Sequence, residues 1–571
     1  MKLYIDARFS VMGLAFIMIC ASNNYLIFGQ SGDTENFQEL LAKANAKTAA
    51  KDWIEAAKSW EAVVRINPVE SKFWRQSAMA QYSAKDYKSA ITSFEKLFEL
   101  GGDMPSVSLY NIATCYSLLG EKEQALNWLE KAFDTGYPNL ERAQTDDNFK
   151  AFRDDARYKK IVGLADTDKM ARDDGWRFDL ALLAREVKRK GYNRVPRKYT
   201  YTEVEAEIKR ISDAVPKLTD MQISMEMMKL IVKLGDGHSA MQGSRVRPEF
   251  CLSVPVKFYL FQEGLFVTAA DAKYKDLLGA QVLKYGEHTV DEVMKALDPF
   301  VSRDNEMQPK EFAPTLMRFL ALANGVGLIP DAKKVSLTIK DAEGKTRTVE
   351  LSVDATAPEV ARVLPANWVS YPQTLALPLP LYLRNLNSTY WYEYLADSKT
   401  VYFQYNNVVN DKAESLAAFT ERLFKFIGEN PVEKLVIDMR WNNGGNTFLN
   451  QPLLLALIRN EKINQRGRLF VIIGRKTFSA AQNSATFFDR FTSVIFVGEP
   501  SGSSPNFIGE ETPFTLPYSK ISVNISNLYW ASSSPLDFRA WIAPTLYTPP
   551  TIEAYKANRD PAMEAILSFR P

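Results

Sequence analysis

The stretch Thr477-Phe478-Ser479-Ala480-Ala481 decides how the C-terminal part of this chain should fold. An apolar run, 469–473, precedes it and predicts a buried strand, and the pattern of 479–490 predicts a helix. Ser479 therefore stands where a strand turns into a helix, next to backbone N–H groups that have no partner inside the helix. A hydroxyl in this position suits a nucleophile whose reaction passes through an oxyanion. Taken alone, such a serine is also an ordinary helix cap.

The sequence around this stretch alternates between apolar strands and amphipathic helices. This alternation predicts a mostly parallel sheet covered by helices. The expected strands are 400–405, 434–439, 468–473 and 494–497, and the expected helices are 413–427, 448–458 and 479–490.

A glycine pair, Gly444-Gly445, follows the second of these strands. Glycines in such a turn leave backbone N–H groups free to point at a ligand. Neighbouring strands of a parallel sheet end at the same edge, so the amide of Gly444 or Gly445 and that of Ala480 are expected to flank one carbonyl oxygen. A Gly-Gly pair alone is a plain turn; its combination with Ser479 predicts an oxyanion hole.

Three segments in order resemble the C-terminal-processing (tail-specific) serine peptidases, whose relatives include the tricorn core protease and the retinoid-binding protein of the eye. They are Asp438-Met439-Arg440 with Asn443-Gly444-Gly445, then Thr477 to Ala481, then Gly498-Glu499-Pro500-Ser501-Gly502. The resemblance covers about 173–549. It implies a crotonase/ClpP-like core with Ser479 as nucleophile and the Gly-Gly amide as oxyanion donor. Some relatives only bind ligands.

The base distinguishes the branches of this family. Processing peptidases use a lysine after the serine, but 477–518 contains none, and Lys520 falls in an expected hairpin. Leu234-Gly235-Asp236-Gly237-His238-Ser239 instead resembles the histidine segment of the tricorn-like branch. A neutral imidazole can accept the serine proton near neutral pH, so His238 is the expected base. The alternative is a loop histidine that caps backbone.

The acid of the triad is expected in the segment from Leu536 to Pro544, which resembles the segment that supplies it in relatives. Asp537 would hold the imidazole in one tautomer and stabilise its cation. Glu510 and Asp236 are rival candidates. The alternative for Asp537 is an ion pair with Arg539 or a turn cap.

Residues 36–138 repeat themselves with a period of 34 or 35 residues: Ala56, Ala90 and Ala125 are equivalent, and so are Trp60, Phe94 and Leu129. A small residue where two helices touch and a large one a turn later suit stacked helical hairpins. The pattern resembles tetratricopeptide (TPR) repeats, which present a concave surface to a peptide or protein. An ordinary helical bundle is the alternative.

The N-terminus has the pattern of a secretory signal peptide. Lys2 and Arg8 precede an apolar core from Phe9 to Cys20, and cleavage is expected between about Ala21 and Gln30. A membrane anchor is the alternative, but the core is short for a span of about 20 residues. Lipidation at Cys20 is a further option. No later stretch is long enough to cross a bilayer, and we expect a periplasmic or secreted bacterial protein.

Composition excludes several functions. The net charge is +2, from 70 basic and 68 acidic residues, which gives no electrostatic case for binding nucleic acid. The chain has two histidines, His238 and His288, and three scattered cysteines, so neither a metal site nor a disulfide framework is expected.

The sequence thus predicts a multidomain protein with TPR-like α-helical repeats, a small PDZ-like β subdomain and an α/β crotonase/ClpP-like core. A Pro-rich stretch, 365–380, reads as a linker. The expected function is an exported serine endopeptidase acting on polypeptides without a cofactor. The alternatives are an inactive binding or scaffold protein that recruits partners through its repeats and, less favoured, an acyl-CoA enzyme. The expected parts are a signal peptide (1–29), repeats (36–165), a helical subdomain (173–245), a PDZ-like/β subdomain (250–355), the peptidase core (385–549) and a C-terminal tail (550–571).

Overall fold

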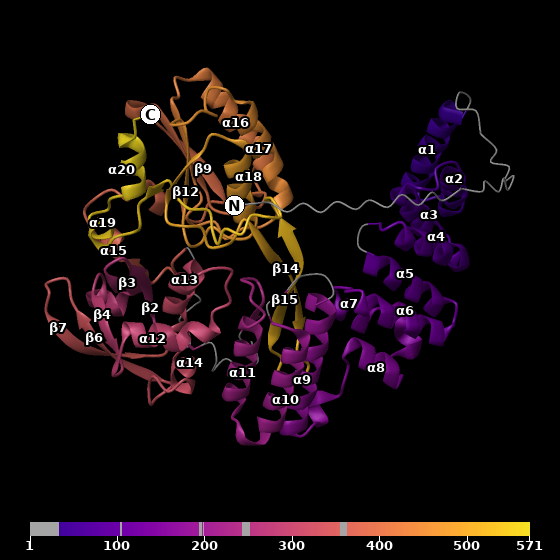
Figure 1. Cartoon of the computed structure of the whole chain (residues 1–571), viewed down its shortest axis with the longest axis horizontal. Coiled ribbons are helices and arrows are strands. Elements are labelled where there is room, and N and C mark those ends of the chain that lie inside the picture. The colour runs from indigo at the N-terminus through magenta and orange to yellow at the C-terminus, as the bar shows by residue number, and fades with distance from the viewer. Residues whose placement is uncertain are drawn as a thin grey trace, which may run out of the picture. The chain divides into compact units, whose positions relative to one another are not determined.

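The computed structural model describes residues 33–102, 105–192, 197, 199–242, 252–354 and 363–570 (Figure 1). The predicted signal peptide, with Cys20, lies outside the described residues, as does Cys251. The chain divides into two compact units, 1–121 and 122–571. Within the described residues, no helix is both long enough and apolar enough to cross a bilayer.

The first unit consists of helices in which each contacts the next along the chain. Ala56, Ala78 and Ala90 are fully buried, as expected where a small side chain lets two helices approach closely. The predicted helical repeats are confirmed as helices, whereas their assignment to the TPR type stays a prediction. The helices are α1 (Asp33–Ala49), α2 (Trp53–Ile66), α3 (Ser71–Ser83), α4 (Tyr87–Glu99) and α5 (Pro105–Leu118).

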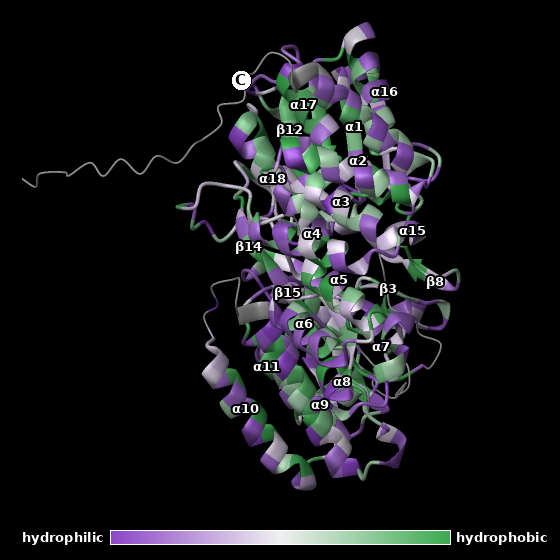
Figure 2. Cartoon of the chain, turned by 90° about the vertical axis from the view of Figure 1, so that its right-hand side faces the viewer, coloured by the Kyte–Doolittle hydropathy of each residue, from purple (hydrophilic) through white to green (hydrophobic). Residues whose placement is uncertain are grey.

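The second unit begins with helices. The first is α6 (Lys122–Asp134), which contains the Ala125 and Leu129 of the predicted third repeat. Thr200 and Thr219 start α10 and α11 with capping boxes, which satisfy backbone N–H groups at the helix ends. Figure 2 shows hydrophobic and hydrophilic bands alternating along α10, as in an amphipathic helix. The remaining helices of this part are α7 (Leu140–Thr145), α8 (Ala156–Val162), α9 (Arg172–Val187), α10 (Tyr201–Ala214) and α11 (Asp220–Val232).

The β subdomain is an antiparallel sheet with strand order β2-β3-β4-β6-β7, to which β5 and β8 add at β4 and β3. One face packs on helices and forms a continuous apolar core. Its PDZ type stays a prediction. The elements are β2 (Val256–Phe261), β3 (Gly264–Asp271), β4 (Gln281–Tyr285), β5 (His288–Thr289), α12 (Val290–Leu297), α13 (Met307–Leu316), α14 (Leu320–Gly325), β6 (Lys334–Lys340), β7 (Thr346–Ser352) and β8 (Trp368–Ser370).

The Pro-rich stretch is not a free linker. Its residues form β8, which pairs with β3, and a short helix, α15 (Tyr371–Thr374). Proline fits the first turn of a helix because the N–H that it lacks would have no partner there.

The core contains a six-stranded sheet of order β16-β13-β12-β11-β10-β9. All neighbouring pairs from β10 to β16 are parallel, and β9 is an antiparallel edge. The mixed α/β prediction is confirmed. The strands are β9 (Tyr390–Leu395), β10 (Thr400–Tyr405), β11 (Lys434–Asp438), β12 (Leu469–Ile473), β13 (Ile495–Gly498) and β16 (Leu546–Tyr547).

Helices cover both faces of this sheet. Alternate strand residues such as Ile437 and Val471 pack on α16 (Leu416–Glu429), α17 (Gln451–Arg459) and α18 (Ala480–Phe491). The residues between them, such as Val436 and Phe470, pack on α20 (Pro561–Ser568). Figure 1 shows α20 on the side of the sheet opposite α16, α17 and α18. Strands buried on both faces explain the continuous apolar runs in the sequence.

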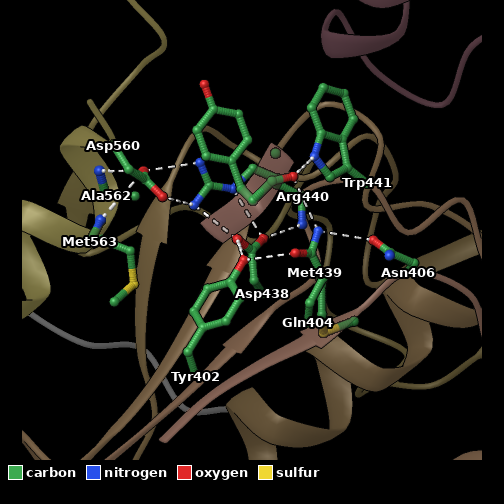
Figure 3. Close-up of polar contacts among 12 residues, drawn as sticks. Tyr402, Gln404, Asn406, Asp438, Met439, Arg440, Trp441, Asp560, Ala562 and Met563 are labelled. Atoms are coloured by element: carbon green, nitrogen blue, oxygen red, sulfur yellow. Dashed lines mark hydrogen bonds and ion pairs between the residues drawn. The ribbon is translucent and has the colours of Figure 1, made fainter. Parts of the chain in front are cut away.

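The segment expected as a C-terminal tail contains two helices, α19 (Ile552–Lys556) and α20, and α20 packs on the sheet. Asp560 caps α20, and the guanidinium of Arg440 donates two hydrogen bonds to its carboxylate, at 3.0 and 2.9 Å (Figure 3). Arg440 also bonds Asp438, at the end of β11, at 3.0 Å. The C-terminal helix is thereby tied to the strand that leads into the Gly-Gly turn.

A long hairpin, β14 (Asn506–Thr515) and β15 (Ser522–Ala531), leaves the sheet after β13. In Figure 1 it runs from the core toward α9, α10 and α11. Strand β1 (Ala240–Gln242) pairs antiparallel with β15, with Ala240 opposite Asn524. Because β1 directly follows the loop of His238, this pairing fixes that loop beside the hairpin.

Candidate active site

Ser479 occupies a strained turn between β12 and α18. Its backbone has φ 54° and ψ −125°, a conformation that residues other than glycine rarely adopt. The hydroxyl of Thr477 supports the turn: it donates to the Met439 carbonyl at 3.0 Å and accepts from the Gly474 N–H at 3.1 Å. A nucleophilic serine held on such a turn presents its Oγ outward at the sheet edge.

The Gly-Gly turn packs directly against Ser479. A Cβ atom added to Gly444 would lie 2.6 Å from the Ser479 Cβ and 2.9 Å from the Ala480 nitrogen, so only glycine fits there. The side chain of Asn442 fixes the turn by accepting from the Gly444 N–H at 2.9 Å and donating to the Tyr405 carbonyl at 2.9 Å.

Two backbone amides at this junction remain available for an oxyanion. The Gly444 N–H is occupied by Asn442, whereas the N–H groups of Gly445 and Ala480 donate to no group among the described residues. Of the alternatives left open by the sequence, Gly445 with Ala480 is therefore the donor pair that the hydrogen bonding favours.

The loop of His238 is held by Asp236. The buried carboxylate accepts hydrogen bonds from the His238 N–H at 3.0 Å and from the Ser526 hydroxyl at 2.6 Å, and it pairs with Arg197 at 2.6 Å. Although burial alone would raise the pKa of Asp236, Arg197 and the hydrogen bonds hold it below its usual value. Asp236 was a rival for the acid, but its contacts are with the loop backbone and Ser526 rather than with the imidazole.

The imidazole of His238 lies between two aromatic rings. Phe478 stacks on it with 4.2 Å between centroids, and Phe507 lies almost parallel to it at 5.5 Å. The side chain is 8% exposed, and neither ring nitrogen makes a hydrogen bond of good geometry to a described residue. Burial lowers the pKa of His238 from its usual 6.5, while Glu511, Asp236 and the Ile508 backbone oppose this shift.

The structure thus brings the segments of Ser479, Gly444, Gly445 and His238 together, since Phe478 is both the stacking partner of the imidazole and the neighbour of Ser479. No hydrogen bond is recorded between the described side chains of His238 and Ser479. Such bonds are often long or misaligned without substrate and form only in the complex.

Asp537 is not brought to His238. Its carboxylate accepts from the Ser533 hydroxyl at 2.6 Å and from the Arg539 Nε at 2.9 Å. Arg539 and Ser533 hold the pKa of Asp537 well below its usual range. In this structure Asp537 forms the ion pair with Arg539 that was the alternative, and its role toward the imidazole stays a prediction.

The carboxylate with the strongest electrostatic effect on the imidazole is Glu511, which the sequence analysis missed. It lies on β14, two residues after Gly509, where an added Cβ would approach the imidazole Cε1 within 3.2 Å. Glu510, the rival candidate for the acid, lies between Gly509 and Glu511. Its backbone φ of 58° makes the strand irregular at this position. Side chains alternate between the two faces of a strand, so Glu511 shares a face with Gly509. This period of two was the signal that could have singled out Glu511.

Asp304 is a second functional candidate that the sequence did not reveal. Its partly buried carboxylate accepts from the Gly237 N–H at 2.7 Å and from the Ser503 hydroxyl. The adjoining Gly502 N–H donates to the Thr477 carbonyl at 3.0 Å. Burial raises the pKa of Asp304 to about 7. Asp304 thus joins the loop of His238 to the segment that braces the serine turn.

No protein-family model matches this chain, and no curated protein matches its sequence. Its fold is similar to several solved structures. Mature CPAF in complex with lactacystin has a TM-score of 0.49 and 12% identity, over 69% of this chain and 97% of that one. The photosystem II D1 C-terminal processing protease has a TM-score of 0.34 and 12% identity, over 69% and 96%.

The tricorn protease has a TM-score of 0.35 and 12% identity, and the match covers 70% of this chain and 36% of that one. At this distance, function has to be inferred from the geometry of the site itself.

Proposed function

We propose that this protein is a serine peptidase in which Ser479 attacks a peptide carbonyl. The observation that carries the proposal is the strained backbone of Ser479, packed on Gly444 and directly preceded by the ring on which His238 stacks. A plain helix cap needs neither the unusual φ nor the glycine contact, and its side chain would accept a backbone N–H, which that of Ser479 does not.

His238 would act as the general base. Because burial lowers its pKa, the imidazole is neutral at pH 7 and ready to accept the proton of the Ser479 hydroxyl. The N–H groups of Gly445 and Ala480 would donate to the oxyanion of the tetrahedral intermediate. The protonated imidazole would then give its proton to the leaving amine, and water would release the acyl group by the same route.

We assign the supporting acid to Glu511 in this arrangement. Its carboxylate favours the protonated imidazole more than any other acidic group near His238. Asp537 would need to exchange Arg539 and Ser533 for the imidazole before it could act in this way. No cofactor enters this mechanism.

The proposed substrate is a polypeptide. The N-terminal pattern from Lys2 to Cys20 supports export to the periplasm or beyond. The helical repeats would recruit a substrate or partner protein. Mass spectrometry of the mature N-terminus tests export. A variant lacking 36–121 tests recruitment, because it should keep reactivity toward a small active-site probe while it loses the partner.

Labelling with a fluorophosphonate tests the nucleophile. The wild-type protein and a Ser484→Ala control, changed one turn further along α18, should gain one phosphonyl group, and Ser479→Ala should gain none. Equal labelling of Ser479→Ala would remove Ser479 from the mechanism.

The missing hydrogen bond between His238 and Ser479 is the one observation that favours the alternative, an inactive binding protein on the same fold. That alternative predicts that the folded wild-type protein neither reacts with the probe nor cleaves an unfolded protein such as casein.

A further inference from the structure

A cavity of about 570 Å³ lies at the carboxyl edge of β11, β12 and β13, where the core meets the β subdomain. Residues of β2 and β3 form one wall, and segments following the core strands form another. The volume falls in the range of about 300 to 1,000 Å³ that is usual for sites of small ligands. Ser479 does not line this cavity, so the cavity is separate from the candidate active site.

The walls are largely aromatic and aliphatic. Strand β2 contributes alternate residues: Val256 and Phe258 point into the core of the subdomain, whereas Lys257 and Tyr259 line the cavity. Trp368, Tyr382, Trp441 and Tyr555 complete the aromatic lining. Such a lining suits an apolar or aromatic ligand body.

The acidic groups on the cavity wall are already paired. Glu311 bonds Lys476 at 3.1 Å, and Glu499 bonds Arg475 at 2.7 Å. Asp560 pairs with Arg440 at 2.9 Å. Figure 3 shows this contact among its dashed lines. No acid on this wall is left over to neutralise a further cation.

Lys257 is the cation that remains. No described residue forms a hydrogen bond or an ion pair with its ammonium group. Burial, together with the positive charges of Lys476 and Arg318, lowers the pKa of Lys257 to about 8, while Glu311 opposes the shift. A partly buried charge of this kind is stabilised when a ligand supplies the opposite charge.

We propose that this cavity binds a small organic acid, with its carboxylate on the Lys257 ammonium and its apolar or aromatic body along Tyr259, Trp368 and Trp441. The carboxylate follows from Lys257, which alone among the cations of the described lining has no ion pair, and the apolar body follows from the aromatic walls. Binding does not require peptidase activity, so it can also be measured in Ser479→Ala.

Calorimetry with dodecanoate, kept below its micelle concentration at pH 7, tests this site. Wild-type protein should bind it, and Lys257→Met, which keeps the apolar stem, should bind at least about tenfold more weakly, because a charge-assisted contact is lost. Lys295→Met, a change at an exposed lysine of the same subdomain, should bind like the wild type. Dodecanol, of equal chain length, should bind the wild type about tenfold more weakly than dodecanoate.

A second measurement uses the unchanged protein, in case Lys257→Met does not fold. Dodecanoate should slow the acetylation of Lys257 by acetic anhydride, read by peptide mass spectrometry, and leave that of Lys295 unchanged. Equal affinity of wild type and Lys257→Met, or no protection of Lys257, would overturn the proposal. Displacement of dodecanoate by a much tighter-binding acetylated peptide with a free C-terminal leucine would assign the site to chain ends and would also overturn it.

Discussion

The imidazole of His238 stacks on the ring of Phe478, with 4.2 Å between the ring centroids, and Phe478 directly precedes Ser479. These two rings come from segments 240 residues apart, and β1 makes their meeting possible by pairing with β15. The ring of Phe507 lies almost parallel to the imidazole as well, with 5.5 Å between the ring centroids. Burial in this aromatic environment lowers the pKa of the imidazole and so favours the neutral base.

The stability of the protein should depend on pH through His238. Its folded pKa is lowered from 6.5, so below pH 6.5 the unfolded chain takes up a proton that the folded one resists. His238 should therefore lower the free energy of unfolding as the pH drops from 7 toward 5, whereas Asp304, whose pKa burial raises to about 7, acts in the opposite direction over this range. Urea denaturation at several pH values measures this slope, which His238→Leu should reduce and His288→Gln should not. An unchanged slope in His238→Leu would contradict the burial of a neutral imidazole.

The acid assignment predicts a difference between two carboxylates. Glu511 raises the pKa of His238, so Glu511→Gln should lower that pKa further and move the acid limb of kcat/KM to lower pH, with a reduced rate. Asp537→Asn should leave the limb in place, since its partners are Arg539 and Ser533. pH profiles of peptide hydrolysis decide between them, and a shift in Asp537→Asn alone would restore the original triad.

Gly444→Ala should disable the site and destabilise the protein. The added methyl group would lie 2.6 Å from the Ser479 Cβ, and the backbone φ of +105° is unfavourable for alanine. We expect a loss of about 2 to 4 kcal/mol in the free energy of unfolding. Gly428→Ala, in an open position on α16, should be neutral or stabilising. Full activity in Gly444→Ala would show that the turn is looser than its contacts indicate.

Ser479→Gly should remove the chemistry but relieve the backbone strain. Glycine adopts φ 54° and ψ −125° readily, so the variant should gain up to about 1 kcal/mol in stability relative to Ser479→Ala. Thermal unfolding of the two variants measures this difference. A less stable glycine variant would mean that the turn stores no strain.

Arg440→Met should strongly destabilise the core, because it leaves Asp438 and Asp560 buried without their cation. Removing one partner of such a cluster costs about 3 to 5 kcal/mol. Arg65→Met removes only an exposed pair with Glu61 and should cost less than about 1 kcal/mol. Chemical denaturation compares the two, and similar small losses would contradict the role of Arg440 in tying α20 to the sheet.

The parts that could be predicted from the sequence depend on local patterns. The buried strands β10 to β13 are apolar runs, and Ser479 and Gly444 stand at their ends. Asp560 followed by Pro561 is also typical of the start of a helix, and α20 begins there. The helix was not predicted because the segment lies at the end of the chain, where a tail was expected. Asp304 reaches the site through the tertiary fold, which no local pattern encodes. The strand period that links Glu511 to Gly509 becomes informative only once the fold places Gly509 beside His238.

The partner that Asp537 takes in this structure was also not settled by its sequence segment. Its segment resembles the acid-bearing segment of relatives, but Arg539, two residues away, offers a closer partner that needs no long-range contact. A short-range ion pair and a catalytic contact cannot be distinguished from the identity of the residues alone.

The rate of phosphonylation as a function of pH tests the central claim most directly, because it requires both Ser479 and His238. Intact mass spectrometry after timed exposure to a fluorophosphonate should show one adduct on the wild type, with a rate that falls at acidic pH as His238 takes up a proton. His238→Gln should react at least about a hundredfold more slowly, since the general base is lost. Equal rates in wild type and His238→Gln across the pH range would contradict the account.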